Sequence, residues 1–176
     1  LNQKIAKSCN NGSILSVATV NNFTNSNADG ARTPLSNNNF VVLGDNNNSS
    51  TSLLALNPVT CPALSDGMFR IAKEWRVQET GAVGPVWIEV DLSNYAINSE
   101  LIMYYGDNAG VNGNSGILPV YSFVGSKAIF LVDFKDNGVQ YFTIAGKVGA
   151  GACATCRGGK YLIKQGDAWN SGAKKL

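Results

Sequence analysis

The stretch FRIAKEWRVQETGAVGPVWIEVDL, residues 69–92, alternates apolar and polar side chains on both sides of a short segment with glycines and a proline. Period-two alternation is typical of β-strands with one buried face. The segment between the halves, residues 79–85, favours a turn because it holds Gly81, Gly84 and Pro85. The stretch is therefore predicted to form one long antiparallel hairpin. The apolar positions are Phe69, Ile71, Trp75, Val77, Val86, Ile88, Val90 and Leu92.

Lys73 interrupts the apolar side of the first half. A β-bulge at this point would explain the interruption. A lysine whose stem packs while its amine reaches water would explain it equally. The sequence leaves both explanations open.

The motif inside this stretch resembles that of β-rich domains in very large secreted surface proteins of Gram-negative bacteria. In that family it reads roughly as an arginine, a short spacer, W-x-V-Q-E-T-G-x-V-G and a β-branched strand. The resemblance covers roughly residues 39–145, and such domains often sit beside laminin-G-like sandwiches in adhesins. It implies an extracellular structural module, offers no catalytic residues to carry over, and says nothing about a ligand. The matching residues are Arg70, Trp75, Val77, Gln78, Glu79, Thr80, Gly81, Val83 and Gly84.

Short apolar runs separated by Gly, Asn, Asp and Pro recur along the rest of the chain. Asp136-Asn137-Gly138 favours a type I′ hairpin. About nine or ten strands without a helix predict an all-β fold, an antiparallel β-sandwich of jelly-roll-like form. A single domain over residues 1–176 is expected, with an N-terminal arm (1–11) and a C-terminal tail (168–176). Beyond the central stretch, strands are expected at 14–20, 40–43, 53–56, 101–105, 117–124, 127–134, 139–145 and 161–164.

Composition excludes several classes of function. The chain has no histidine, which removes Ser-His-Asp and Cys-His catalysis and histidine zinc sites. A net charge of +2 is too small to indicate nucleic acid, and no apolar run approaches membrane-spanning length. Few charges with many Asn, Ser, Thr and Gly are typical of an extracellular β protein. We therefore expect a processed, secreted chain at the cell surface.

An even number of cysteines in a secreted chain predicts structural disulfides, and three pairings can be drawn. The residues are Cys9, Cys61, Cys153 and Cys156. The spacing of the last two also matches half a zinc site or a redox motif. Zinc would lack the usual second close pair, and Arg157-Gly158-Gly159 is a poor helix start for a redox motif. Disulfides between subunits are a further alternative.

Three expected strands end in Gly-Asp, each followed by residues with oxygen-bearing side chains. After the first, such side chains stand at alternate positions, as in calcium loops. The expected cofactor is therefore calcium, although Gly-Asp-Asn can also simply form turns. The candidate ligands are Asp45, Asn47, Ser49, Asp107, Asp133, Asp136 and Asp167.

Aromatic side chains are the candidates for binding sugars, although core or interface packing is the commoner role of such residues. The candidates are Trp87, Trp169, Tyr104 and Tyr105. Carboxylates near the tryptophans are expected on the solvent-facing side of strands, which argues against a glycosidase pair. They are Glu74, Glu79, Glu89 and Asp91.

These observations predict a non-catalytic extracellular structural module that self-assembles into a surface filament or forms part of a large adhesin. Its expected partners are copies of itself. An extended arm that adds a strand to the edge of a neighbouring sandwich would form the contact. The alternative is a calcium-dependent carbohydrate-binding, lectin-like domain whose partner is a surface polysaccharide.

Overall fold

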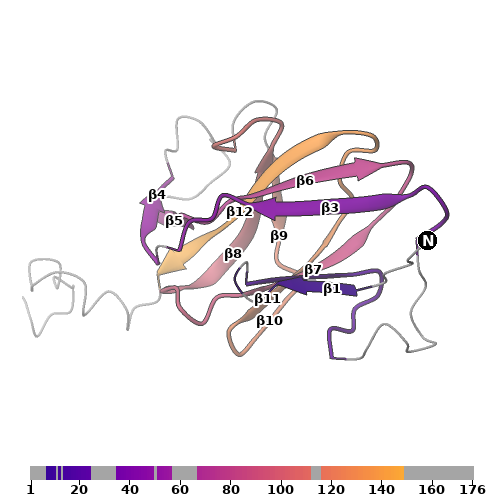
Figure 1. Ribbon diagram of the computed structural model, residues 1–176. Coiled ribbons are helices and arrows are strands. Elements are labelled where there is room, and N and C mark those ends of the chain that lie inside the picture. The colour runs from indigo at the N-terminus through magenta and orange to yellow at the C-terminus, as the bar shows by residue number, and fades with distance from the viewer. Residues whose placement is uncertain are drawn as a thin grey trace, which may run out of the picture.

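The computed structural model describes residues 7–10, 12, 14–24, 35–49, 51–56, 67–111 and 116–148. In these ranges the chain forms twelve β-strands and no helix. The strands build two antiparallel sheets that pack as a sandwich (Figure 1). The predicted all-β, antiparallel sandwich is therefore confirmed. The expected last strand at 161–164 and the tail at 168–176 lie outside the described residues.

The first sheet has five strands in the spatial order β1-β2-β7-β11-β10. Strand β7 lies at its centre, since it pairs with β2 on one side and with β11 along its whole length on the other. The expected N-terminal arm contributes a strand here, because β1 pairs with β2 of the same chain. The strands are β1 (Lys7–Asn10), β2 (Leu15–Ala18), β7 (Val86–Asp91), β10 (Ser122–Val124) and β11 (Lys127–Val132).

The second sheet has seven strands around β12. Strand β12 pairs with β5 and β6 on one side and with β8 on the other. The outer strands are β3 beside β6, β4 beside β5, and β9 beside β8. The strands are β3 (Phe40–Asp45), β4 (Leu53–Ala55), β5 (Met68–Ile71), β6 (Trp75–Thr80), β8 (Ile97–Gly106), β9 (Gly116–Pro119) and β12 (Val139–Val148).

The two halves of the stretch 69–92 do not pair with each other. Strand β6 lies in the second sheet and β7 in the first, so the connection between them crosses the sandwich. The predicted hairpin is therefore wrong, whereas the alternation is correct: Trp75 and Val77 are buried, as are Val86 and Ile88. Alternation indicates which face of a strand is buried and leaves its partner strand undetermined.

A second expected hairpin fails in the same way. Residues 135–138 do form a turn, in which the N–H of Gly138 donates to the carbonyl of Lys135 at 3.0 Å and Asn137 has φ 52°. The turn joins β11 of the first sheet to β12 of the second. The segment 117–124 likewise divides into β9 and β10, which belong to different sheets. In this sandwich, a short turn therefore either joins two paired strands as a hairpin or connects a strand of one sheet to a strand of the other.

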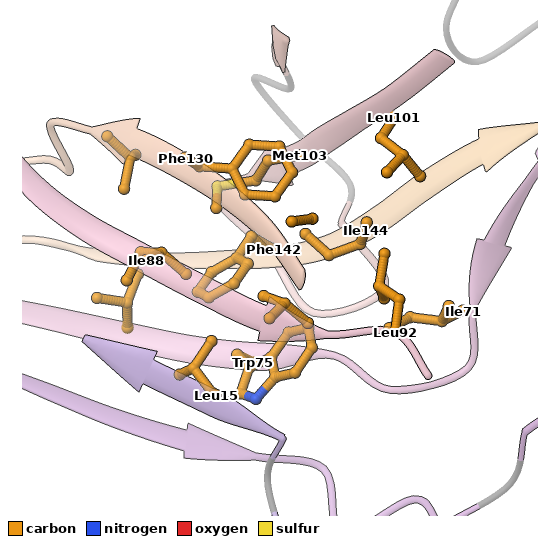
Figure 2. Packing of buried hydrophobic residues seen from close by; sticks show 14 of the residues in the cluster. Leu15, Ile71, Trp75, Ile88, Leu92, Leu101, Met103, Phe130, Phe142 and Ile144 are labelled. Carbon is orange, nitrogen blue, oxygen red and sulfur yellow. The ribbon is translucent and has the colours of Figure 1, made fainter. Parts of the chain in front are cut away.

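The main core fills the space between the sheets (Figure 2). Trp75 stacks on Phe142 with ring centroids 5.2 Å apart, and Phe134 packs on Phe142 at 5.5 Å. The first sheet contributes Ile88 and Phe130, both fully buried. Each such side chain contributes about 1.5–3 kcal/mol by leaving water. The two sheets are therefore held together by one continuous apolar layer.

A smaller apolar cluster covers part of the outer face of the second sheet. Tyr104 and Ala145 point away from the main core, because they alternate with Met103 and Ile144, which belong to it. Val111, in the chain after β8, is fully buried against this outer cluster. The chain after β8 thus folds back over its own sheet. The cluster comprises Met68, Tyr104, Val111 and Ala145, with Leu56 and Ile102 packed against it.

Candidate functional site

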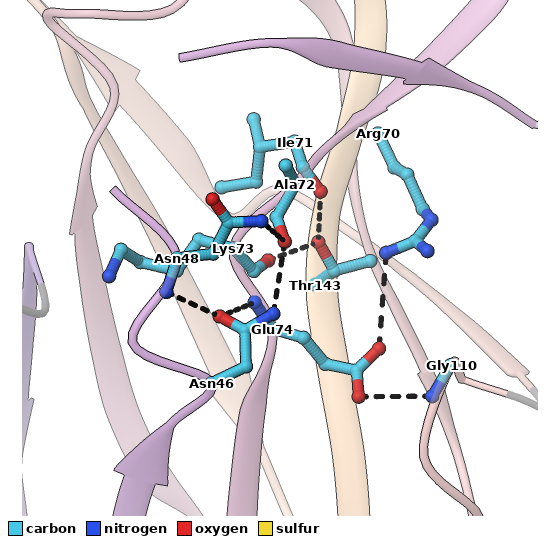
Figure 3. Close-up of polar contacts among 9 residues, drawn as sticks. All are labelled: Asn46, Asn48, Arg70, Ile71, Ala72, Lys73, Glu74, Gly110 and Thr143. Carbon is cyan, nitrogen blue, oxygen red and sulfur yellow. Dashed lines mark hydrogen bonds and ion pairs between the residues drawn. The ribbon is translucent and has the colours of Figure 1, made fainter. Parts of the chain in front are cut away.

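Strands β5 and β6 are separated by a break at residues 72–74. Polar side chains hold the backbone of this break in place (Figure 3). The side-chain amides of Asn46 and Asn48 donate to the carbonyl of Ala72 at 3.1 and 3.3 Å. The side-chain oxygen of Asn46 accepts from the N–H of Glu74 at 3.3 Å. These bonds replace the ladder bonds that the break removes. The asparagine-rich loop after β3 therefore acts as a clamp on the break.

Lys73 lies in this break with its side chain only 5% exposed. Its amine donates to Asp45 Oδ2 at 3.1 Å, so the amine meets a carboxylate and does not reach bulk water. The strand is interrupted here and the amine is held by Asp45, so neither of the two explanations that the sequence left open, a bulge or an amine in water, describes Lys73. The other oxygen of Asp45 accepts from the N–H of Asn47 at 2.8 Å. Thr143 supports the break from β12, because its hydroxyl donates to the carbonyl of Lys73 at 2.8 Å.

Two of the three Gly-Asp segments lie in one row across the second sheet. Gly44 pairs with Arg76, Arg76 with Tyr141, and Tyr141 with Gly106. Three strand spacings separate the ends of this row by about 14 Å. Asp45 and Asp107 therefore cannot hold the same ion.

The remaining candidate calcium ligands are scattered. Ser49, Asp133 and Asp136 are exposed, and Asp167 lies outside the described residues. In the described part of the chain, no group of three or more His, Cys, Asp or Glu side chains is arranged to hold a metal ion. Calcium at the loop after β3 stays a prediction.

A groove of about 360 Å³ opens on the outer face of the second sheet, between the loop after β3 and the chain after β8. Arg76 lines it and donates to the side-chain oxygen of Gln78 at 3.2 Å. Glu74 forms one wall, and its carboxylate accepts from the N–H of Gly110 at 3.0 Å. Tyr141 adds an aromatic ring to the lining. The groove thus combines a cation, a carboxylate and an aromatic surface.

The aromatic candidates occupy different surroundings. Tyr104 is buried in the outer cluster, and Tyr105 packs against the main core. Trp87 meets Tyr121 edge to face, with ring centroids 4.8 Å apart. Tyr121, which the sequence analysis did not single out, is 63% exposed and lies between β9 and β10, where no periodic pattern marks it. Trp169 lies outside the described residues.

Glu79 is buried, contrary to the expectation from the sequence. It was expected to face solvent, but its side chain is buried, at 2% exposure, on the inner side of β6 after Trp75 and Val77. Neither carboxylate oxygen has a hydrogen-bond partner. Burial raises its pKa to about 7, and the negative charges of Asp133 and Asp136 add to the effect. The same alternation that predicted the core would have placed Glu79 inside.

The other carboxylates near tryptophans have ordinary partners. Glu89 accepts from the amine of Lys127 at 2.9 Å. Asp91 accepts from the N–H of Ser93 at 2.9 Å and from the hydroxyl of Ser126 at 3.0 Å. These bonds lower the pKa of Asp91, with the backbone N–H of Ser93 as the largest cause.

The predicted disulfides fall largely outside the described residues. Cys9 belongs to β1, whereas Cys61, Cys153 and Cys156 lie in undescribed segments. The pairing of the four cysteines therefore stays a prediction.

The fold places the chain among all-β sandwich proteins. More particularly, the chain belongs to the family described as a domain of unknown function (DUF8202), which matches residues 1–138. No curated protein and no solved structure matches the chain. The resemblance to domains of secreted adhesins stays a prediction. Among the described residues, no helix is long and apolar enough to cross a membrane.

Proposed function

We propose that this chain is a non-catalytic extracellular structural module whose copies associate through the edge strand β3. The observation that carries the proposal is the exposed edge of this strand. In the described part of the chain, β3 pairs only with β6, so no described strand lies against its other side. Such an edge is a template for another strand.

The side chains of β3 suit this role. Phe40 and Val42 point outward and are 48% and 54% exposed. The strand contains no proline or lysine, the residues that commonly protect an edge. Its single charge, Asp45, is paired with Lys73. Nothing on the strand itself therefore opposes the approach of a second strand.

The other described edge strands are shorter or protected. Strand β3 has six residues, whereas β1 has four and β4 and β10 have three each. Strand β9 has four residues and ends in Pro119, which lacks an N–H donor. We therefore assign the contact between copies to β3. A strand from a different part of the next copy would make this contact head-to-tail, which builds an open filament.

The extracellular setting is supported by the low charge content, 15% of residues, and by the four cysteines. Low charge also reduces repulsion between copies. The same contact would serve a filament of separate chains or neighbouring modules of one large adhesin.

Sedimentation of the intact chain and of Val42→Lys tests the proposal. The intact chain should associate as its concentration rises, and the lysine should weaken association at least tenfold by placing a charge on the edge. Val124→Lys is the matched control, because Val124 is exposed on an edge strand of the first sheet. An intact chain that stays monomeric at high concentration would refute the proposal, as would Val42→Lys associating like the control.

The groove on the second sheet favours a second candidate, a calcium-dependent carbohydrate-binding domain. Arg76 and Tyr141 offer a hydrogen-bond donor and a stacking surface in one hollow. Calorimetric titration with soluble polysaccharides, with and without calcium, tests it. Tyr141→Ala should abolish any binding that occurs in the groove, whereas Tyr121→Ala, on the first sheet's side, should leave it unchanged.

A further inference from the structure

The free side of β3, at the edge of the second sheet, is defined by the way the strand bonds to β6 (Figure 1). Just beyond the paired residues, the N–H of Asn46 donates to the carbonyl of Glu74 at 3.0 Å. Hydrogen bonding alternates from residue to residue along an antiparallel pair. The even-numbered residues of β3 therefore direct their backbone groups to β6, whereas the backbone groups of Val41 and Leu43 point away from it. A further strand would bond to these two residues.

The outer face of β3 presents a ring at one end and a hollow at the other. Phe40 and Val42 are 48% and 54% exposed. Gly44 follows on the same face and lines the groove beside Arg76, its partner on β6. A Cβ at Gly44 would meet no atom within 4 Å, so this position has room for a side chain from another strand.

We propose that β3 pairs with β3 of a second copy of this chain, antiparallel and with two-fold symmetry, and that Val42 faces its own counterpart at the centre. In this register Phe40 lies opposite Gly44 of the second copy, and Val41 lies opposite Leu43. This pairing rests on the proposed function, association through β3, and identifies the partner strand.

The backbone of β3 fits this register. Val41 of each copy exchanges both of its hydrogen bonds with Leu43 of the other, because these are the residues whose groups point away from β6. The pairs on the outer face are then the non-hydrogen-bonded ones, in which the Cα atoms approach to about 4.5 Å. Each Phe40 ring therefore lies close over Gly44 of the other copy, where the exposed guanidinium of Arg76 can contact its face.

The inner face of β3 favours the same register. Val41 and Leu43 are partly buried against the main core, so pairing each with the other extends the apolar layer across the contact. A shift by one residue would set outward side chains against inward ones. A shift by two would either set Asp45 opposite Val41 or leave only 40–42 paired within the strand.

A contact between two copies of β3 is isologous, so it closes at two copies. It would join two chains, or modules of two large adhesins, and a longer assembly needs a second contact. Pairing with any other strand of the next copy would instead be head-to-tail and would continue. The paired segment, 40–44, is short beside the roughly 20–30 residues per side of a standard interface. We therefore expect weak, reversible association that a covalent link can trap.

Disulfide trapping tests the pairing. Val42→Cys is introduced into the intact chain, which is oxidised mildly at increasing concentration. The two substituted positions should link, because a Cα separation of about 4.5 Å lies within the range of disulfides. Mass spectrometry of the linked peptides distinguishes this bond from any that the native cysteines form. Val124→Cys is the matched control, since Val124 is also exposed on an edge strand, and its chains should link at least tenfold more slowly.

A mixture of two variants tests the register. Phe40→Cys and Gly44→Cys should link to each other at least tenfold faster than either variant links to itself. Gly44 accepts a side chain, since it has open space around it and no positive φ. Equal rates in the mixture and in the separate variants would overturn this register.

The outcomes separate the pairing from the association itself. An oligomer in sedimentation that forms no link at position 42 would overturn the two-fold pairing and leave association through β3 to another strand of the next copy. An intact chain that stays monomeric at every concentration would overturn both.

Discussion

The ion pair between Lys73 and Asp45 should be one of the strongest polar contacts in the molecule. The two side chains are 5% and 16% exposed, and the charged atoms lie 3.1 Å apart. Removing one partner of such a pair leaves an uncompensated charge and costs about 3–5 kcal/mol in buried sites. Because Asp45 retains some exposure, we expect Asp45→Ala to lower the free energy of unfolding by about 3 kcal/mol.

The reverse substitution should cost much less. Lys73→Met keeps the apolar stem and removes the buried charge, while Asp45 keeps the N–H of Asn47 and some contact with water. We expect a loss of about 1 kcal/mol. In the background of Lys73→Met, the further change Asp45→Ala should cost much less than it does in the intact chain. The coupling energy should therefore be about 2 kcal/mol.

Urea unfolding at pH 7, followed by tryptophan fluorescence, measures all four free energies. The control cycle uses Glu89→Ala and Lys127→Met, whose lysine is 52% exposed and whose coupling should stay below about 1 kcal/mol. The reasoning is refuted if Asp45→Ala costs less than 1 kcal/mol, or if the two changes at the break add without coupling.

Three further predictions concern Glu79, the turn after β6 and the cysteines. The pKa of Glu79 is raised from 4.5 to about 7, so the folded chain binds the extra proton between these values. The contribution of Glu79 to stability is complete below pH 4.5 and is lost progressively as pH rises from 4.5 through about 7, a loss on the order of 3 kcal/mol. Urea unfolding at several pH values across this range should show the decline, and Glu79→Gln should remove it. Gly81→Ala should lower the free energy of unfolding by about 1–3 kcal/mol, because φ at Gly81 is +78° and the new Cβ would clash with the side chain of Asn39. The control Gly84→Ala, at φ +72° with open space around the new Cβ, should lower it by less in the same assay. Thiol titration of the denatured, unreduced chain should find no free thiol, and four reactive thiols would contradict the predicted disulfides.

Side-chain alternation predicted burial well and strand pairing poorly. In β6 and β7 it identified the inward residues because burial follows the two-residue period of a strand. It did not reveal that Val77 pairs with Leu43 on one side and Gln140 on the other. These partners lie far along the chain, and their register depends on the packing of the whole sandwich. The nearest strand in the sequence was therefore the wrong partner.

The candidate sites were harder to predict than the core. The partner of Lys73 is 28 residues away, in a loop whose composition pointed to calcium instead. Glu79 was placed at the start of the expected turn and grouped with the solvent-facing carboxylates near the tryptophans. Its place in the alternation was the better guide, since that pattern put it on the side of Trp75 and Val77. A polar residue at an inward position is the signal that identifies such a site.

The central proposal, association through β3, is tested most directly by hydrogen exchange at increasing protein concentration. Amides of β3 that point away from β6 have no partner strand in the described part of a single chain. We predict that exchange in the peptide covering 40–45 slows markedly as concentration rises, while exchange in β10, at an edge of the first sheet, stays constant. Fast exchange in β3 at every concentration would contradict the account.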